Sequence, residues 1–171
     1  MKKLLNLILM VCISYSCLCQ SSASKFKAMP GEAARLENRF NMEVVGKHNP
    51  ELLNEILGED FISHHFPAPG KNNKMAFTEG MKGLFAGFPD LKITTVEQHE
   101  QGDKVYTYAY WEGTHTGIFM GVPPTNKKAH VEYMDIWRVR DGKIRENWVV
   151  MDIMGLMIQL GVIPAPGSAN K

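Results

Sequence analysis

The sequence predicts an α+β fold in which N-terminal helices pack on one face of a curved antiparallel sheet. In the first half, up to about Phe88, apolar residues recur at helical spacing. In the second half, aromatic and β-branched residues alternate with polar ones, and turn signals separate the segments. The Asp141-Gly142 pair is typical of a tight hairpin. Helices followed by a meander of strands indicate the α+β class.

The helical elements follow from this pattern in chain order. An apolar stripe predicts a helix that begins at Gly31, and the breaker pair Asn49-Pro50 interrupts it. Three further helices are expected over short segments: Glu51–Leu57, Lys74–Phe88 and Met154–Leu160.

Four strands are expected in the second half: Leu91–Gln98, Lys104–His115, Ala129–Arg140 and Lys143–Asp152. Side chains alternate between the two faces of a strand. Counting in twos places His115 on the face of Trp111. The same count places Asp152 on the face of Trp148 and Val150.

The first residues predict export. Met1-Lys2-Lys3, an apolar run and a small-residue stretch are typical of a secretory signal peptide over residues 1–19. The apolar run is shorter than the roughly 20 residues that span a bilayer, so no membrane span is predicted. Lipidation at Cys17 or Cys19 is the alternative to cleavage before Gln20. A single domain over residues 31–163 would follow, with flexible ends at residues 20–30 and 164–171.

Composition narrows the function classes. All three cysteines lie within residues 1–19, so the exported chain would have no disulfide and no thiolate metal site. Without Lys2 and Lys3 the 19 basic residues become 17 against 18 acidic ones, a net charge of −1. This charge argues against nucleic acid as a partner. No nucleotide-binding glycine loop, zinc-protease motif or nucleophile elbow occurs, and no cofactor is predicted.

A series of spaced motifs carries a family resemblance. In chain order they are Phe88-Pro89-Asp90-Leu91, Gly113-Thr114-His115-Thr116-Gly117, Gly121-Val122-Pro123-Pro124-Thr125, Glu146-Asn147-Trp148 and Gln159-Leu160-Gly161. The series resembles the SnoaL-like polyketide cyclase (ester cyclase) family of the nuclear transport factor 2-like superfamily. The resemblance implies a cone-shaped curved antiparallel sheet closed by N-terminal helices, with a mostly apolar pocket inside. It also implies cofactor-independent, aldol-type ring closure of polyketide esters, and a homodimer formed through the outer face of the sheet, where Tyr106, Tyr108 and Tyr110 would lie.

The resemblance also suggests site residues. It places the family's last-strand aspartate, the acid/base, on Asp152, with His115 and His64 near it as further catalytic residues. Trp148, Trp111 and Met134 are candidate substrate-binding walls of the pocket. Partial desolvation beside an indole favours the neutral form of a carboxyl, which suits proton exchange. The alternatives are structural: Asp152 as the N-cap of the following helix, and His115 as a turn residue.

Two functions remain open at this point. The first is an acid/base enzyme acting on a small apolar carbonyl or polyketide-like compound. The second is a non-catalytic extracytoplasmic binding protein for a small hydrophobic molecule. A metal site is not predicted, because the adjacent pair His64-His65 has poor spacing for a shared ion.

Overall fold

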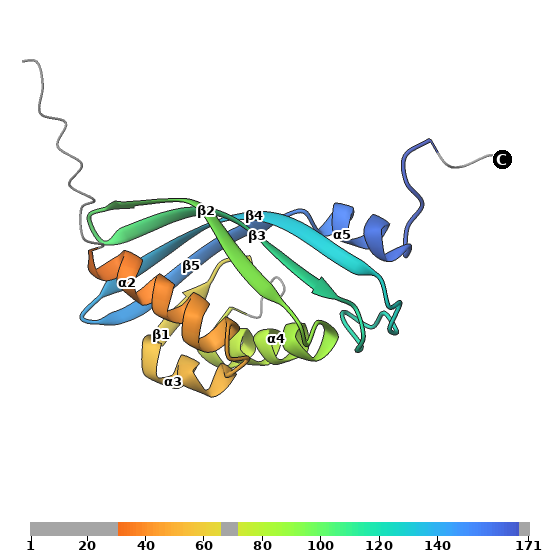
Figure 1. The fold of residues 1–171 in the computed structure, drawn as a ribbon. Helices are drawn as coiled ribbons and strands as arrows, with labels where there is room; N and C mark the ends of the chain where they lie inside the picture. The colour runs from red at the N-terminus through yellow and green to blue at the C-terminus, as the bar shows by residue number, and fades with distance from the viewer. Residues whose placement is uncertain (1–30, 66–71, 168–171) are drawn as a thin grey trace, which may run out of the picture.

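Five strands form one curved sheet, and most of the helices lie along its concave side (Figure 1). The computed structural model describes residues 31–65 and 72–167. The strands stand in the order β1-β5-β4-β3-β2. Their bounds are β1 Leu57–Ser63, β2 Lys92–Gln101, β3 Lys104–Thr114, β4 Lys128–Arg140 and β5 Lys143–Met151. The predicted α+β fold with a curved sheet closed by helices is confirmed.

The helices agree closely with the sequence pattern. They are α2 Glu32–Arg39, the π-helix η1 Phe40–Val45, the 3₁₀-helix η2 Pro50–Leu52, α3 Leu53–Ile56, α4 Lys74–Gly87 and α5 Ile153–Leu160. The π-helical turn was not predicted. There the backbone N–H of Gly46 donates to the carbonyl of Asn41 at 2.9 Å, five residues earlier.

Strand β1 corrects the prediction of a wholly antiparallel sheet. It lies at the sheet edge and runs parallel to β5, with Leu57 opposite Ile144 and Ser63 opposite Asn147. The other three strand pairs are antiparallel. The buried positions of β1 do not alternate regularly, so its local pattern does not reveal its partner or its direction.

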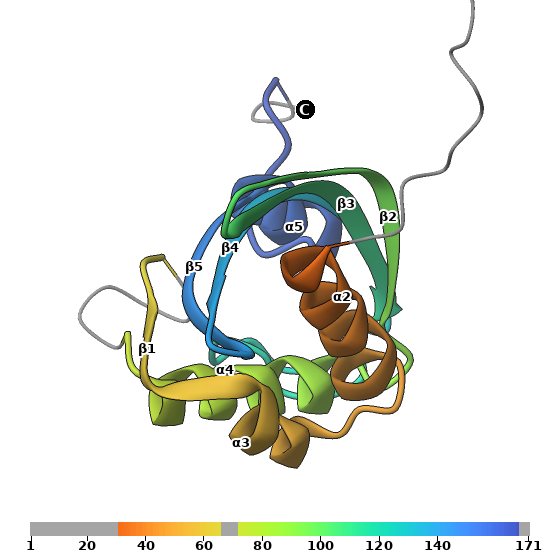
Figure 2. The same ribbon diagram turned by 90° about the vertical axis from the view of Figure 1, so that its left-hand side faces the viewer.

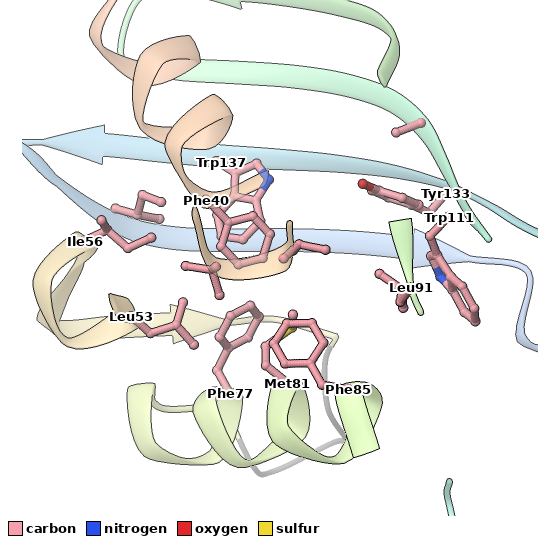
Figure 3. Packing of buried hydrophobic residues seen from close by; sticks show 14 of the residues in the cluster. Phe40, Leu53, Ile56, Phe77, Met81, Phe85, Leu91, Trp111, Tyr133 and Trp137 are labelled. Atoms are coloured by element: carbon pink, nitrogen blue, oxygen red, sulfur yellow. The ribbon is translucent and has the colours of Figure 1, made fainter. Parts of the chain in front are cut away.

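The sheet curls around α2, and α4 closes the opposite side (Figure 2). Aromatic side chains from both the helices and the strands fill the space between these layers (Figure 3). The ring centroids of Phe40 and Trp137 are 4.9 Å apart, and those of Phe61 and Phe77 are 5.2 Å apart. The core therefore lies on the concave side of the sheet, and any enclosed site must lie there too.

The predicted signal peptide and the segment of residues 20–30 lie outside the described residues, as do residues 168–171. Export and lipidation at Cys17 or Cys19 therefore stay predictions. Within residues 31–65 and 72–167, no helix has the length and apolar character needed to cross a bilayer.

Candidate active site

A β-bulge determines which side chains of β5 face the helices. Arg138 of β4 pairs with Glu146, but the next residue of β4, Val139, pairs with Ile144. Arg145 is therefore an extra residue in β5, and an extra residue inverts the alternation that follows it. Beyond the bulge, the residues that line the cavity are Asn147, Val149 and Met151.

The concave side of the sheet encloses a cavity with a wider entrance. The inner cavity has a volume of about 60 Å³, and the outer hollow has one of about 470 Å³. Four residues line both spaces and mark the place where they meet: Leu84, Trp111, Val149 and Met151. A single water needs roughly 10–15 Å³. The inner cavity thus admits a functional group, and the outer hollow has room for the rest of a small molecule.

Asp135 is the carboxyl group on the cavity wall. It lies on β4 among inward-facing apolar residues, and only 7% of its surface is exposed. Its Oδ2 accepts a hydrogen bond from Trp137 Nε1 at 2.7 Å, whereas Oδ1 has no partner among the described residues. Burial raises the pKa of Asp135 well above its ordinary value, and the nearby charge of Glu37 adds to this effect.

Three further polar groups border the same cavity. Asn147 Oδ1 accepts from Ser63 Oγ at 3.4 Å, but Asn147 Nδ2 is buried without a partner in the described part of the chain. Trp111 Nε1 is likewise buried without a hydrogen-bond partner among the described residues. Burial raises the pKa of Tyr133, as do the charges of Asp135 and Glu37. A free carboxyl oxygen and free N–H donors on an otherwise apolar wall can bind the oxygen of a ligand and exchange a proton with it.

Asp152 lies outside this cavity. Its exposed carboxylate accepts from Gly155 N–H at 2.7 Å and forms the N-cap of α5. The alternative role of Asp152 as a helix cap is confirmed. The prediction that Asp152 faces the pocket is wrong. The count in twos correctly groups Asp152 with Trp148 and Val150, but beyond the extra residue Arg145 this group lies away from the inner cavity, which Asn147, Val149 and Met151 line.

His64, Trp148 and Met134 also lie on the outer face. His64 Nε2 is 3.0 Å from Glu146 Oε2, and its ring stacks on Trp148 with centroids 4.5 Å apart. Met134 is 63% exposed. The predicted pocket position of these three residues is wrong. The adjacent His65 lines the outer hollow, whereas His64 does not. Of the predicted wall residues, Trp111 alone is in the cavity.

His115 is buried, but it secures a loop and does not line the cavity, so its predicted place in the pocket is wrong. Its Nδ1 accepts from Thr125 N–H at 3.3 Å and lies 3.1 Å from Thr125 Oγ1. Its backbone N–H donates to Lys127 O at 2.9 Å. Burial lowers the pKa of His115, which favours the neutral ring. His115 thereby clamps the two ends of the loop 116–124, which carries Ile118, Phe119 and Met120 to the outer hollow.

The described residues contain no group of three His, Cys, Asp or Glu side chains placed to hold a metal ion. His64, Asp152 and His115 take part in separate interactions, with Glu146, Gly155 and Thr125 respectively.

Comparison with known proteins identifies the family. Residues 35–160 match the model of the SnoaL-like polyketide cyclase family. The chain belongs to this family. The nogalonic acid methyl ester cyclase of Streptomyces nogalater is 33% identical over 72 residues, which are 42% of this chain and 54% of that relative. The chain thus spans about half the length of that curated relative.

Solved structures of SnoaL-like proteins have the same fold. IdmH from Streptomyces antibioticus, assigned as a polyketide cyclase, has a TM-score of 0.64 and 29% identity; the match covers 75% of this chain and 97% of IdmH. A SnoaL-like protein from Jannaschia sp. CCS1 has a TM-score of 0.71 and 21% identity, with 85% of this chain and 99% of that chain covered. The latter match supports the fold alone.

Sequence reasoning missed Asp135, Asn147 and Glu37. A signal for Asp135 was present, because every second residue of β4 around it is apolar or aromatic: Ala129, Val131, Tyr133, Trp137 and Val139. A signal for the bulge was present as well, because the consecutive charged residues Arg145 and Glu146 both avoid the inner face. Glu37, on a helix otherwise rich in charged residues, has no comparable signal.

Proposed function

We propose that this chain is a cofactor-independent acid/base enzyme of the cyclase, isomerase or lyase type, acting on a small apolar carbonyl or polyketide-like compound. The observation that carries the proposal is the carboxyl of Asp135, buried on the cavity wall with its Oδ1 unpartnered among the described residues. Membership of the polyketide cyclase family supports the reaction class.

The proposed chemistry needs one carboxyl and one amide. A ligand carbonyl oxygen accepts from Asn147 Nδ2, which polarises the carbonyl. Ionised Asp135 takes a proton from the adjacent carbon, and the resulting enolate oxygen is stabilised by the same amide. When the enolate carbon attacks a second carbonyl, Asp135 returns the proton to the new alkoxide. The pKa of Asp135, raised by burial, makes its anion a stronger base than an exposed aspartate.

Geometry supports the pairing of these two groups. Trp137 of β4 stands opposite Asn147 of β5, and Asp135 stands opposite Val149, so Asp135 and Asn147 are diagonal neighbours on one face of the sheet. Diagonal Cβ atoms in such a pair are about 7–8 Å apart or somewhat less, which leaves room for a carbonyl group between the two side chains.

A direct test is the exchange of ketone α-protons with deuterated water, followed by NMR for a panel of small 1,3-diketones and aromatic ketones. The full chain is expected to accelerate exchange, and Asp135→Asn to lose roughly 10²–10⁴-fold of that rate. Asp152→Asn is the matched control, expected to keep the wild-type rate. An equal loss in both variants would contradict the assignment to Asp135.

A binding function is the second candidate. It is favoured by one observation: beyond the bulge, the cavity-lining residues of β5 are an amide and two apolar side chains, with no carboxylate. In this case the cavity holds a small hydrophobic molecule outside the cytoplasm without turnover. Ligand binding to the full chain with unaccelerated proton exchange across the whole panel would favour this candidate.

The family resemblance also leads us to propose a homodimer through the outer face of the sheet. Tyr108 pairs with Met134 and Met134 pairs with Val150, which makes a row across three strands. Met134 is 63% exposed and Val150 is 70% exposed. Burial of such a row in a second copy would remove apolar surface from water. Sedimentation of the full chain and of Met134→Lys tests the pairing, with the variant expected to be monomeric.

A further inference from the structure

A second carboxyl group is buried behind the one on the cavity wall. Glu37 of α2 is 1% exposed and does not line the cavity. Its Oε2 accepts from Thr107 Oγ1 at 2.8 Å and from Gln98 Nε2 at 3.0 Å. Thr107 of β3 stands directly opposite Asp135 of β4. The hydroxyl that binds Glu37 therefore belongs to the cross-strand neighbour of Asp135, on the side of the sheet that curls around α2 (Figure 2).

Neither carboxyl has a compensating cation. In the described part of the chain, no lysine, arginine or histidine forms an ion pair with Glu37 or Asp135, and none contributes to either pKa. The third titratable group that faces the pair is Tyr133, whose pKa the two carboxylates raise. At the beginning of α2, Glu100 accepts hydrogen bonds from the backbone N–H groups of Ala33 and Ala34. Two buried carboxylates without a cation do not both ionise near neutral pH.

The surroundings distinguish the two carboxyls. Glu37 accepts from two side chains, whereas Asp135 accepts from Trp137 alone and keeps one oxygen without a donor. Hydrogen-bond donors stabilise the anion, so the negative charge of a singly protonated pair favours Glu37, and the proton favours Asp135. Burial raises the pKa of Glu37 to about 7 despite these two hydrogen bonds.

We infer that Glu37 and Asp135 form a carboxyl pair that holds one proton at neutral pH, in which Glu37 is a positioning residue that controls the ionisation of Asp135. Once Glu37 has ionised, at a pH of about 7, Asp135 is the acid of the pair and Glu37 the anion. Transfer of the proton from Asp135 to Glu37 leaves the net charge unchanged and gives the Asp135 anion at the cavity. The catalytic use of that anion rests on the proposed function, whereas the pairing itself does not.

Glu37→Gln is the principal variant, because its amide keeps an oxygen acceptor for Thr107 and Gln98 but loses the charge. Glu32→Gln is the matched control, since Glu32 is exposed on the same helix. The apparent pKa of Asp135 is followed by carbon-detected NMR of its carboxyl in the full chain. Glu37→Gln is expected to lower this pKa by about one pH unit or more, because a like charge has been removed. Glu32→Gln is expected to leave it unchanged.

A second variant keeps the inference testable if Glu37→Gln does not fold. Thr107→Val removes the hydroxyl that donates to the Glu37 anion, which shifts the negative charge of the pair toward Asp135, so Asp135 is expected to titrate at a lower pH than in the wild type. An unchanged Asp135 titration in either variant overturns the pair.

The pH dependence of ketone proton exchange separates this inference from the proposed function. If Asp135 is the base, the rate rises with pH as Asp135 ionises, and in Glu37→Gln this rise moves to lower pH by the same amount as the Asp135 titration. A shifted titration in a chain that accelerates no exchange supports the carboxyl pair and contradicts the proposed enzyme. Accelerated exchange with an unshifted titration supports the enzyme and contradicts the pair.

Discussion

Both faces of the β4–β5 pair carry carboxyl groups, but the pKa is raised on the inner face and lowered on the outer face. On the inner face, burial raises the pKa of Asp135. On the outer face, partial burial also pushes the pKa of Glu146 upward, but hydrogen bonds from His64 and Arg138 and the positive charge of Arg138 outweigh it, so this pKa lies below its ordinary value. The supply of cations, not the residue type, thus decides which carboxyl is suited to exchange protons near neutral pH.

The two faces also differ in how they use tryptophan. Trp137 on the inner face donates to Asp135 and packs on Phe40 (Figure 3). Trp148 on the outer face stacks on His64, with Lys104 Nζ 5.2 Å from its ring centroid. The inner tryptophan contacts buried side chains, whereas the outer one contacts charged side chains that are partly exposed to solvent. Substitutions inside should therefore have the larger effects.

The largest stability effect is expected at Glu37. Burial raises its pKa from 4.5 to about 7, so between these values the folded chain holds a proton that the unfolded chain releases. Stability therefore falls as pH rises through this window. Glu37→Gln removes the ionisation and should raise the free energy of unfolding at pH 8 by roughly 3 kcal/mol, with little change at pH 4. Urea unfolding at the two pH values measures this difference.

Glu146→Gln is the outer-face control for that experiment. Its lowered pKa means that the ionised form stabilises the fold above the ordinary pKa of a glutamate, so the variant should lose stability at pH 8 and change little at low pH. If the free energy of unfolding at pH 8 changed in the same direction in Glu37→Gln and Glu146→Gln, the proposed difference between the two faces would be wrong.

The two tryptophans give a smaller, matched test. Trp137→Phe leaves a buried carboxyl oxygen of Asp135 without its donor, which should cost about 1–3 kcal/mol of stability. Trp148→Phe keeps an aromatic ring beside His64 and should cost less than about 1 kcal/mol. Thermal unfolding of both variants at pH 7 makes the comparison. A greater loss in Trp148→Phe would show that the outer face contributes more than its exposure suggests.

The smallest effect is expected at Asp152. Asp152→Ala removes the side chain that caps α5 and should cost about 1 kcal/mol without changing ketone proton exchange. Asp152→Asn keeps a capping oxygen and should stay within about 0.3 kcal/mol of the wild type. Urea unfolding and the exchange assay are read on the same samples. A loss of exchange in Asp152→Asn at unchanged stability would return the acid/base role to this residue.

The fold was predictable because its signals are local. Helical spacing placed α2 and α4, and the Asp141-Gly142 pair marked the hairpin between β4 and β5. The parallel pairing of β1 was not predictable from residues 57–63, because it depends on contacts with a strand about 80 residues later.

The candidate site was harder to predict because the alternation along β5 does not show which of its two faces lies inward. On β3, where no bulge interrupts its pairing with β4, the predicted wall residue Trp111 does line the cavity. On β5, the extra Arg145 turned Trp148 and Asp152 outward and Asn147 inward. Asp135 was missed for a different reason. A lone aspartate on an apolar strand face was not considered as a buried group, although a buried carboxyl with a raised pKa is a candidate for proton transfer.

The clamp at His115 has a consequence for how such a protein can diversify. The loop 116–124 is anchored where Thr125 and Lys127 bind His115, and its side chains reach the outer hollow but not Asp135 or Glu37. Exchanging this loop alone would change the lining of the outer hollow, whereas Asp135 and Glu37 would keep their positions. On the proposed function, ligand selection and proton transfer therefore depend on different parts of the chain, and a library randomised at Ile118 and Met120 would vary the ligand without altering either carboxyl.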